Sequence, residues 1–353
     1  MKIELSNDVQ NALNNFSVPE QVGFGQTLLP IMITSQYEDG KWSPLEISPY
    51  ADLRIDPSMK VLHYAQEIFE GLKGYISEDD QALLFRPDQN AKRFNHSAER
   101  MAMPNLPEEM FLEAVKEITK LGKPFIPREE GSSLYIRPFM FASEVGLGIK
   151  PAEKFIFMVI ASPSGPYFNT GNLNVLIERE AVRAVSGGVG TAKTGGNYAA
   201  SLLSAKKSKE FGCQQTIWLD AIQRENIEEM SGMNFMAVIN NKLVTPSLTD
   251  TILAGITRSS LLDLAKEMGV ETIEKTLTIS ELLESIKKGE CTEAFACGTA
   301  AVVTPIALFK ETTGEQFELS EPNGDLGQKL KARLLHIQNA KEEGPTGWSI
   351  KID

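Results

Sequence analysis

The sequence predicts a protein of two domains with a mixed α/β (α+β) structure. The chain has 353 residues, and at about 150 residues per domain two domains are expected. Both halves contain short apolar runs typical of strands, separated by segments with helix signals. A stretch rich in Pro, Gly, Ser and Asn, from Ser162 to Gly171, lies between the halves. We therefore expect a domain at 1–163, an interdomain loop at 164–173 and a domain at 174–353.

In the first half, two helices are expected after prolines. Pro87 suits a first helical turn, and the helix should continue from Asn90 to Met101. Pro107 precedes the second helix, Glu108 to Leu121, which Gly122 should end. Strands are expected at Val61 to Tyr64, Leu72 to Ile76, Leu83 to Phe85, Ser133 to Phe141 and Phe155 to Ile160.

The second half carries two local signals with a clear mechanism. Asn240 and Asn241 should turn a hairpin within Phe235 to Val244. Thr278, with Glu281 three residues later, forms a capping-box pattern that should begin a helix. Other strands are expected at Asn174 to Ile177, Gln215 to Leu219 and Phe295 to Leu308, and other helices at Tyr198 to Glu210, Gly255 to Gly269 and Leu326 to Glu343.

Composition and charge exclude several classes of function. The formal net charge is -12 and no basic run is present, so we expect no nucleic-acid partner and no membrane partner. Three cysteines without a Cys-x-x-Cys pair and three scattered histidines predict neither disulfides nor a metal site. The N-terminus has no apolar signal core. These features are typical of a cytoplasmic protein.

A single lysine, Lys193, lies in unusually open backbone. Residues 186–198 read Ser-Gly-Gly-Val-Gly-Thr-Ala-Lys-Thr-Gly-Gly-Asn-Tyr. A nucleotide-binding loop would need glycine where Ala192 stands, and Gly195-Gly196 is a poor helix start. A surface turn with a solvated lysine is a second interpretation. The third is a lysine that forms a Schiff base with an aldehyde cofactor, where glycines let the backbone approach a flat ring.

Pyridoxal 5'-phosphate, such an aldehyde cofactor, needs a carboxylate at its ring nitrogen and N–H groups or cations at its phosphate. Glu228 and Glu229 are candidates for the carboxylate, although both could be solvated at a strand end. Gly255 to Arg258 at a helix start and Gly298 to Ala300 between strands are candidates for the phosphate site. A plain helix cap and a strand bend explain them equally well.

Together, these motifs resemble those of the branched-chain amino acid aminotransferases, which are class IV aminotransferases with the fold-type IV pyridoxal phosphate fold. The resemblance covers about 62–305. It implies a small N-terminal α/β domain and a larger C-terminal β-barrel-like domain flanked by helices. The motifs are Phe69 to Lys73, Phe85 to Pro87, Tyr135 to Pro138, Lys193 to Tyr198, Glu229 to Asn234, Gly255 to Arg258 and Ala296 to Ala301.

The resemblance implies roles for individual residues. Lys193 matches the lysine that binds the cofactor and moves the substrate proton. Tyr198 matches the tyrosine at the ring phenolic oxygen, and Glu229 matches the acid at the ring nitrogen. The implied phosphate contacts are Arg93, Ile256, Thr257 and Thr299, and the implied substrate contacts are Tyr64, Phe69, Tyr135, Arg137, Thr299 and Ala300.

The implied activity is transamination between L-leucine, L-isoleucine or L-valine and 2-oxoglutarate. The resemblance also implies a homodimer in which Phe141 to Ile149 reaches the active site of the partner subunit. Arg137 would meet the distal carboxylate of glutamate. The alternatives are a D-amino acid aminotransferase or aminodeoxychorismate lyase of the same fold, a P-loop-like nucleotide-binding protein and a non-catalytic binding protein.

Two positions depart from the family pattern. Ala301 to Thr304 occupies the stretch where some animal members carry a Cys-x-x-Cys pair, so we expect that redox switch to be absent. Gly232 stands where some members carry a threonine near the substrate, which changes the hydrogen bonding expected there.

Overall fold

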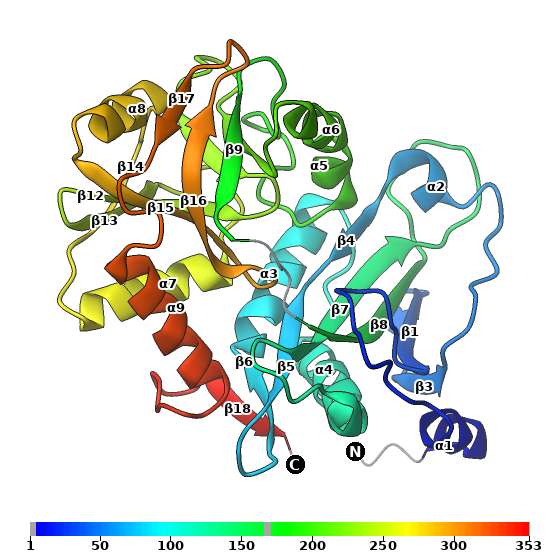
Figure 1. Cartoon of the computed structure of the whole chain (residues 1–353). Helices are drawn as coiled ribbons and strands as arrows, with labels where there is room; N and C mark the ends of the chain where they lie inside the picture. The colour runs from blue at the N-terminus through cyan, green and yellow to red at the C-terminus, as the bar shows by residue number, and fades with distance from the viewer. Residues whose placement is uncertain (1–4, 166–170, 353) are drawn as a thin grey trace. The chain divides into compact units, whose positions relative to one another are not determined.

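The computed structural model describes residues 5–165 and 171–352 (Figure 1). The chain divides into two compact units, and each is described by itself. Among the described residues, the first unit comprises 5–165, 192–195 and 336–352, and the second comprises 171–191 and 196–335.

The division of the chain differs from the one expected from the sequence. The whole of 174–353 was expected to form a larger C-terminal domain, whereas 192–195 and 336–352 belong to the first unit. The two units are consequently similar in length. Residues 166–170, in the middle of the expected interdomain loop, lie outside the described residues.

A nine-stranded sheet forms the centre of the first unit as described. Its strands are β1 (Ile31–Glu38), β2 (Lys41–Trp42), β3 (Glu46–Pro49), β4 (Glu67–Phe69), β5 (Leu72–Ile76), β6 (Ala82–Phe85), β7 (Ser133–Ala142), β8 (Phe155–Ser164) and β18 (Ser349–Ile352). The main path is β18-β6-β5-β7-β8-β1-β2, with β3 paired to β1 and β4 paired to β7. The pairing of β18 with β6 is antiparallel and draws the C-terminal segment into this sheet.

The helices of the first unit pack against the sheet, and aromatic side chains from both form part of the core. They are α1 (Asn7–Asn14), α2 (Lys60–Tyr64), α3 (Pro87–Arg100) and α4 (Glu108–Gly122), followed by the 3-10 turn Lys123–Phe125. The α4 helix contacts β1, β6, β7 and β8 and also packs against α3. Phe94 of α3, Phe111 of α4 and Phe157 of β8 are buried with ring centroids 5.4 to 6.3 Å apart. Burying each such side chain stabilises the fold by about 1.5–3 kcal/mol.

Most expectations for this unit are confirmed, but one is wrong. Val61 to Tyr64, expected to be a strand, lies in the short helix α2. A short apolar run cannot be assigned by periodicity alone, and tertiary contacts decide here. The buried Lys60 pairs with Glu144 at 2.8 Å, and Ala65 ends the turn with a left-handed φ of 48°.

The second unit is built on a mixed sheet, also nine-stranded as described. Its strands are β9 (Leu173–Glu178), β10 (Gln215–Leu219), β11 (Ile227–Met230), β12 (Asn234–Ile239), β13 (Lys242–Pro246), β14 (Thr272–Lys275), β15 (Cys291–Gly298), β16 (Val302–Lys310) and β17 (Gln316–Glu318). The path is β11-β10-β9-β16-β15-β12-β13-β14, with β17 paired to β16. β11 lies at one end of this path and β12 lies near the other end. A turn closed by a bridge between Met230 and Met233 connects the two strands.

Five helices as described belong wholly or mainly to this unit, and two of them connect parallel strands, as parallel pairing requires. They are α5 (Gly195–Ala199), α6 (Leu202–Glu210), α7 (Ile256–Glu267), α8 (Ile279–Lys287) and α9 (Asp325–Gln338). The α6 helix lies between β9 and β10 in the chain and α7 between β13 and β14, and both strand pairs are parallel. In Figure 1, α8 lies beside β17, which it contacts.

The hairpin and most other expectations for this unit are confirmed. Asn240 and Asn241 have φ values of 51° and 61°, as the tight hairpin turn requires. Three details differ. The helix expected from Tyr198 to Glu210 is split into α5 and α6, α9 ends at Gln338, and Gly195, expected to be a poor helix start, is the first residue of α5.

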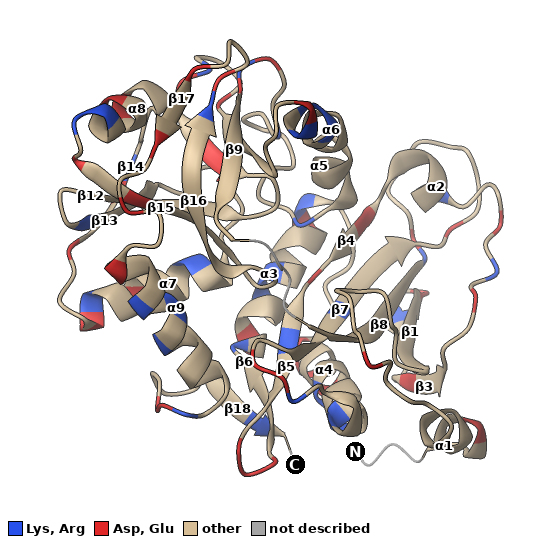
Figure 2. Cartoon of the chain, in the orientation of Figure 1, with Lys and Arg blue, Asp and Glu red and all other residues tan. Residues whose placement is uncertain are grey.

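Charge is spread over the surface of each unit. Figure 2 shows Lys and Arg interspersed with Asp and Glu on the helices and loops. Within the described residues, no helix is long and apolar enough to span a lipid bilayer.

The cap of α8 provides a test of local stability. Thr278 accepts a hydrogen bond from the Glu281 N–H at 3.0 Å. We expect Thr278→Ala to lower the free energy of unfolding by about 1 kcal/mol, because a first-turn N–H loses its acceptor. Thr278→Ser keeps the hydroxyl and should unfold at nearly the wild-type urea concentration. Equal losses in both variants would contradict the role of this cap.

Candidate active site

The backbone of Lys193 is held by strand β4 and helix α3 of the first unit. The Lys193 N–H donates to Ser97 Oγ at 3.0 Å. The Phe69 N–H donates to the Lys193 carbonyl at 2.9 Å. Two residues later, the Gly195 N–H donates to the carboxylate of Glu67. Lys193 is half-buried, so the solvated surface turn considered from the sequence is wrong.

Two glycines of the motif allow close packing rather than turns. A Cβ on Gly190 would lie 2.6 Å from the Thr251 Cα, where real Cβ atoms are not found. A Cβ on Gly195 would meet the carboxylate of Glu67. The open sequence around Lys193 is therefore closely packed in the structure.

Four residues expected in the site meet within the first unit. The Lys193 ammonium lies 5.0 Å from the ring centre of Phe69. The Arg137 guanidinium lies 4.7 Å from the same ring centre and donates to the Tyr135 hydroxyl at 2.9 Å. The Arg137 Nε atom is buried and has no hydrogen-bond partner among the described residues. A buried N–H without an acceptor is costly, and a carboxylate is the acceptor that best suits a guanidinium.

Glu70, to which the sequence assigned no role, holds Arg93 in place. The Arg93 Nε and Nη2 atoms donate to the two carboxylate oxygens at 2.7 and 2.9 Å. Asn90 donates to the same carboxylate at 2.7 Å. Burial alone would raise the pKa of Glu70, but the charges of Arg93 and Lys193 together with these bonds lower it below its ordinary value. Glu70 is therefore ionised and fixes the guanidinium of Arg93.

Local packing explains why a glycine, Gly71, follows Glu70. A Cβ on Gly71 would overlap the hydroxyl of Tyr135. The Phe-Glu-Gly motif thus supplies an aromatic ring, a buried carboxylate and space for a tyrosine.

Tyr64 lies in a different environment from these residues. It belongs to α2, and its hydroxyl donates to the carbonyl of Leu147. The loop that contains Leu147 is apolar and exposed, and Ile149 is 88% exposed. The structure places Tyr64 with the loop expected to reach a partner subunit.

In the second unit, Glu229 of β11 is buried and held by Arg183. The Arg183 Nε lies 3.2 Å from the carboxylate, which also accepts from the Leu253 N–H. Arg183 donates in addition to the Thr251 carbonyl at 2.8 Å. A neighbouring guanidinium favours the ionised carboxylate. The sequence analysis missed Arg183, since nothing in its immediate neighbours distinguishes it from a surface arginine.

Glu228 differs from Glu229 although the two are adjacent. Consecutive residues of a strand face opposite sides, and Glu228 accepts from the Thr251 hydroxyl at 2.6 Å. Burial raises the pKa of Glu228 above its ordinary value. Glu228 and Glu229 are 6% and 2% exposed, so neither is the solvated carboxylate considered from the sequence.

Tyr198 and the start of α7 complete the second group. Tyr198 lies against Gly232, where a Cβ would be 3.2 Å from the tyrosine ring. The α7 helix begins at Ile256 and Thr257, and no described side chain caps it. Its first N–H groups are therefore suited to an anion. Thr299 and Ala300 lie in the turn between β15 and β16.

The site residues thus form two groups, one in each unit, and metal-ligating residues do not gather in either. Among the residues described, no three His, Cys, Asp or Glu side chains are arranged to hold a metal ion. The first group contains Phe69, Arg93, Tyr135, Arg137 and Lys193, and the second contains Tyr198, Glu229, Ile256, Thr257, Thr299 and Ala300.

Comparison with known proteins assigns the family. The family described as amino-transferase class IV matches residues 67–309. The chain belongs to the class IV aminotransferase family, and the predicted family and fold class are confirmed.

Related sequences within the family carry a narrower description. The chain is 45% identical to branched-chain-amino-acid transaminase 1 of Bacillus subtilis over 339 residues, covering 95% of each chain. It is 42% identical to the branched-chain-amino-acid aminotransferase of Mycolicibacterium smegmatis, covering 96% of this chain and 94% of the other.

Solved structures agree with this assignment. The branched-chain aminotransferase of Thermoproteus uzoniensis, crystallised with norvaline, has a TM-score of 0.76 at 25% identity. The structural match covers 91% of this chain and 100% of the Thermoproteus uzoniensis chain. The branched-chain aminotransferase of Escherichia coli has a TM-score of 0.74 at 25% identity, covering 91% and 99%.

The Glu70–Arg93 pair predicts a pH-dependent stability. Because the pKa of Glu70 is lower in the folded than in the unfolded state, its stabilisation is complete above the ordinary carboxyl pKa of about 4.3 and is lost as pH falls through the folded-state pKa. We expect Glu70→Gln to lower the free energy of unfolding by about 3 kcal/mol at pH 7, since it removes the negative charge that compensates the largely buried Arg93 guanidinium. The difference should shrink when denaturation is repeated at pH 4 and below.

The control for this prediction is Asp88→Asn on α3, the helix that carries Arg93. Asp88 makes an exposed contact with Lys92 at 3.7 Å and accepts from the Gln89 side chain at 2.7 Å, and both contacts involve an exposed carboxylate, so the loss should stay within about 0.5 kcal/mol. A Glu70 variant as stable as this control would contradict the pairing.

Proposed function

We propose that this chain is a pyridoxal phosphate-dependent branched-chain aminotransferase. It would transfer an amino group between L-leucine, L-isoleucine or L-valine and 2-oxoglutarate, giving branched-chain 2-oxo acids and L-glutamate. The observation that carries the proposal is the fixed backbone of Lys193, with its ammonium beside the Phe69 ring that the Arg137 guanidinium also contacts. The two related sequences described above are named branched-chain-amino-acid transaminase and branched-chain-amino-acid aminotransferase.

The second unit offers partners for the cofactor ring. Glu229, held by Arg183, would accept from the ring nitrogen and keep it protonated. Tyr198 would donate to the ring phenolic oxygen, and Gly232 leaves room for its ring. When bound, pyridoxal phosphate withdraws electrons from the substrate Cα, which lets the Cα proton leave.

The phosphate would be bound by groups that are already oriented. The uncapped start of α7 offers the N–H groups of Ile256 and Thr257, and Thr299 would add a further contact. Arg93 would contribute a guanidinium whose direction Glu70 sets. Main-chain N–H groups and a guanidinium are donors that suit a phosphate anion.

Lys193 would hold the cofactor covalently and then act as the proton carrier. In its neutral form the Nζ atom accepts the proton that leaves the substrate Cα. The bonds of the Lys193 main chain to Ser97 and Phe69 keep this atom within reach while the side chain moves.

The same group would bind both kinds of substrate. Phe69, Tyr135 and Tyr64 suit the apolar side chain of a branched amino acid. The Arg137 Nε–H would donate a hydrogen bond to the distal carboxylate of 2-oxoglutarate or glutamate. The Ala300 main chain, in the turn after β15, would bind the other carboxylate.

The other functions considered from the sequence fit less well. A P-loop needs a strand directly before the glycines, but β9 ends at Glu178, well before Lys193. A non-catalytic binding protein would not need the paired charges around Glu70 and Glu229. D-amino acid aminotransferase and aminodeoxychorismate lyase share the fold, and substrate assays separate them from our proposal.

We also propose a homodimer in the cytoplasm. Val145, Leu147 and Ile149 are 54, 65 and 88% exposed in one loop, and clustered exposed apolar residues mark interaction surfaces. This loop would reach the partner subunit's active site. The cysteines Cys213, Cys291 and Cys297 are free and buried, which suits a reducing compartment.

The proposal is tested by the absorption spectrum of the purified protein with and without L-leucine. We expect a visible band from a covalently bound cofactor that moves to the near ultraviolet when the amino group is transferred. Lys193→Ala should lose at least 1,000-fold in kcat, since one residue supplies both attachment and proton transfer. Lys206→Ala, which removes an exposed lysine, serves as the control. Faster transamination of D-alanine than of L-leucine would contradict the assignment.

Glu229→Gln tests the ring-nitrogen role separately from folding. A neutral amide cannot keep the ring nitrogen protonated, so we expect kcat to fall by roughly a hundredfold, as when one preorganised electrostatic partner is lost. The visible band should remain, because Lys193 is intact. Unchanged kcat in this variant would move the role to another residue.

A further inference from the structure

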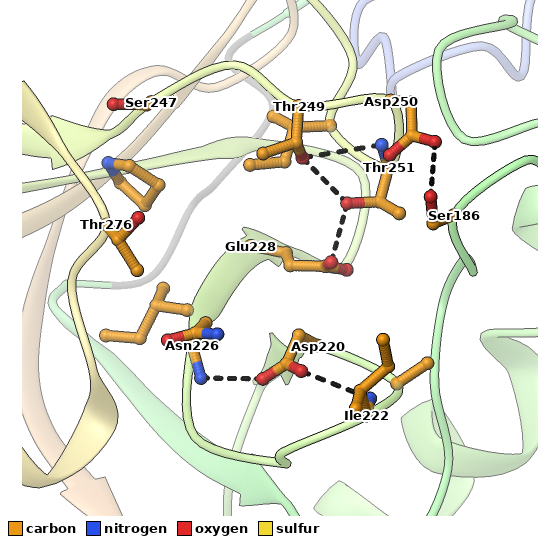
Figure 3. Close-up of a pocket in the computed structure, with 14 residues that line it drawn as sticks. Ser186, Asp220, Ile222, Asn226, Glu228, Ser247, Thr249, Asp250, Thr251 and Thr276 are labelled. Atoms are coloured by element: carbon orange, nitrogen blue, oxygen red, sulfur yellow. Dashed lines mark hydrogen bonds between the residues drawn. The ribbon is translucent and has the colours of Figure 1, made fainter.

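A pocket of about 200 Å³ lies in the second unit beside Glu228 (Figure 3). It is lined by β11, by the loop after β10 and by the loop after β13. Glu228 faces it, whereas Glu229, the next residue of the same strand, faces the opposite side. The pocket is therefore separate from the group around Glu229.

Glu228 brings an unsatisfied carboxylate oxygen to this pocket. Its side chain is 94% buried, given an exposed fraction of 6%. The Oε1 atom accepts from the Thr251 hydroxyl at 2.6 Å. The Oε2 atom is buried and has no hydrogen-bond partner within the described part of the chain. Buried carboxylate oxygens are normally paired, so this atom indicates a donor that the chain itself does not supply.

The surroundings of Glu228 favour a positively charged donor. Asp220 and Asp250 line the same pocket. Burial raises the pKa of Glu228, and the negative charges of these two aspartates raise it further. The positive charge of Arg183, which does not line the pocket, lowers the pKa of Glu228. Within the described residues, the lining contains no Lys or Arg. The pocket would therefore attract a cation and repel a carboxylate.

The two aspartates are already engaged, which leaves Glu228 as the main acceptor. Asp220 accepts main-chain N–H bonds from Ile222 at 3.1 Å and from Asn226 at 2.8 Å. Asp250 Oδ2 accepts from Ser186 at 2.7 Å. An inorganic cation would need several oxygens to replace its water shell, whereas much of this lining is apolar.

The remaining walls fit the body of a small organic ion. Ile222, Ile227, Pro246 and Ile252 provide apolar surface, and a volume of about 200 Å³ exceeds the roughly 30 Å³ share of one water several times. We propose that this pocket binds a small primary alkylammonium ion. Its ammonium group donates to Glu228 Oε2 and to the neighbouring threonine hydroxyls, and its alkyl part contacts the isoleucines.

An ammonium group matches the acceptors in number and kind. It has three N–H donors and no acceptor. The hydroxyl acceptors beside the Glu228 carboxylate are Thr251, which bonds Glu228 Oε1 at 2.6 Å, and Thr249, whose hydroxyl lies 2.8 Å from that of Thr251. Figure 3 shows both threonines above the Glu228 carboxylate and Asp250 beside them. An amino acid would bind poorly, because its carboxylate would find no cation. The proposed ligand therefore differs from the proposed substrates, and this site does not depend on the proposed activity.

Propylammonium is the probe for this site, with calorimetric titration as the measurement. The protein is first reduced with sodium borohydride, so that an amine cannot exchange with Lys193 at a bound cofactor. We expect one saturable site in the wild-type protein. Glu228→Gln should weaken binding at least tenfold, since the charge is lost while the shape is kept. Thr249→Val removes a hydroxyl at the exposed rim and should weaken binding about threefold.

Matched controls separate this site from general attraction to an acidic protein. Glu271→Gln removes an exposed carboxylate of the same unit that pairs with Lys242, and it should leave propylammonium binding unchanged. Tetramethylammonium has the charge without N–H donors and should bind at least tenfold more weakly than propylammonium. Absence of a saturable site, or equal binding to the Glu228 variant, would overturn the proposal. Equally strong binding of potassium would also overturn it, because the ligand would then be an inorganic cation.

Discussion

Two main-chain hydrogen bonds at Lys193 fix the backbone from which its ammonium group extends: its N–H donates to Ser97, and its carbonyl accepts from the Phe69 N–H. A lysine side chain has many rotamers and cannot be placed by its own geometry. Fixing the backbone instead lets the side chain move along the reaction while its range stays limited. Glu67, which accepts from Gly195, extends the same restraint to the start of α5. Packing at Gly190 and Gly195 leaves no space for side chains that would displace this segment.

Buried ion pairs on each unit orient the charges that the chemistry requires. Glu70 and Arg93 form one pair, and Arg183 and Glu229 form the other. Such pairs add little net stability, because removing both charges from water costs about as much as their attraction returns. Their effect here is on direction: each carboxylate receives two or more donors, and each guanidinium is held by more than one acceptor. A partner that arrives later meets groups that do not have to reorganise.

The sequence predicted the regular parts of the fold wherever local physics determines them. The hairpin at Asn240 and Asn241 follows from residues that tolerate positive φ, and the start of α8 follows from the Thr278 cap. The short helix at Val61 to Tyr64 was mistaken for a strand, because a short apolar run does not distinguish the two, and the contact of the adjoining Lys60 with the distant Glu144 cannot be read from the sequence. The strand β18 was missed for the same kind of reason, since its pairing with β6 joins residues far apart in the chain.

For the site, family motifs indicated the residues that would touch the cofactor and substrate, but not those that support them. Arg183 and Ser97 show no local pattern, and Glu70 lies inside the Phe69 to Lys73 motif without a role that the motif itself indicates. The roles of all three appear only when the chain is folded. The two adjacent glutamates are the clearest case. In the sequence Glu228 and Glu229 are nearly equivalent, yet one is bound by an arginine and the other by a threonine hydroxyl. Their difference comes from the alternation of a strand between two environments.

The central claim is that Lys193 is the lysine that carries the cofactor. The most direct test is to reduce the purified protein with borohydride and to locate the pyridoxyl group by mass spectrometry of its peptides. The account predicts that the label lies on the peptide that contains Lys193. The most informative competitor is Lys73, since burial lowers its pKa to about 8 and so makes it a plausible nucleophile. A label on Lys73, or on any lysine other than Lys193, would contradict the account.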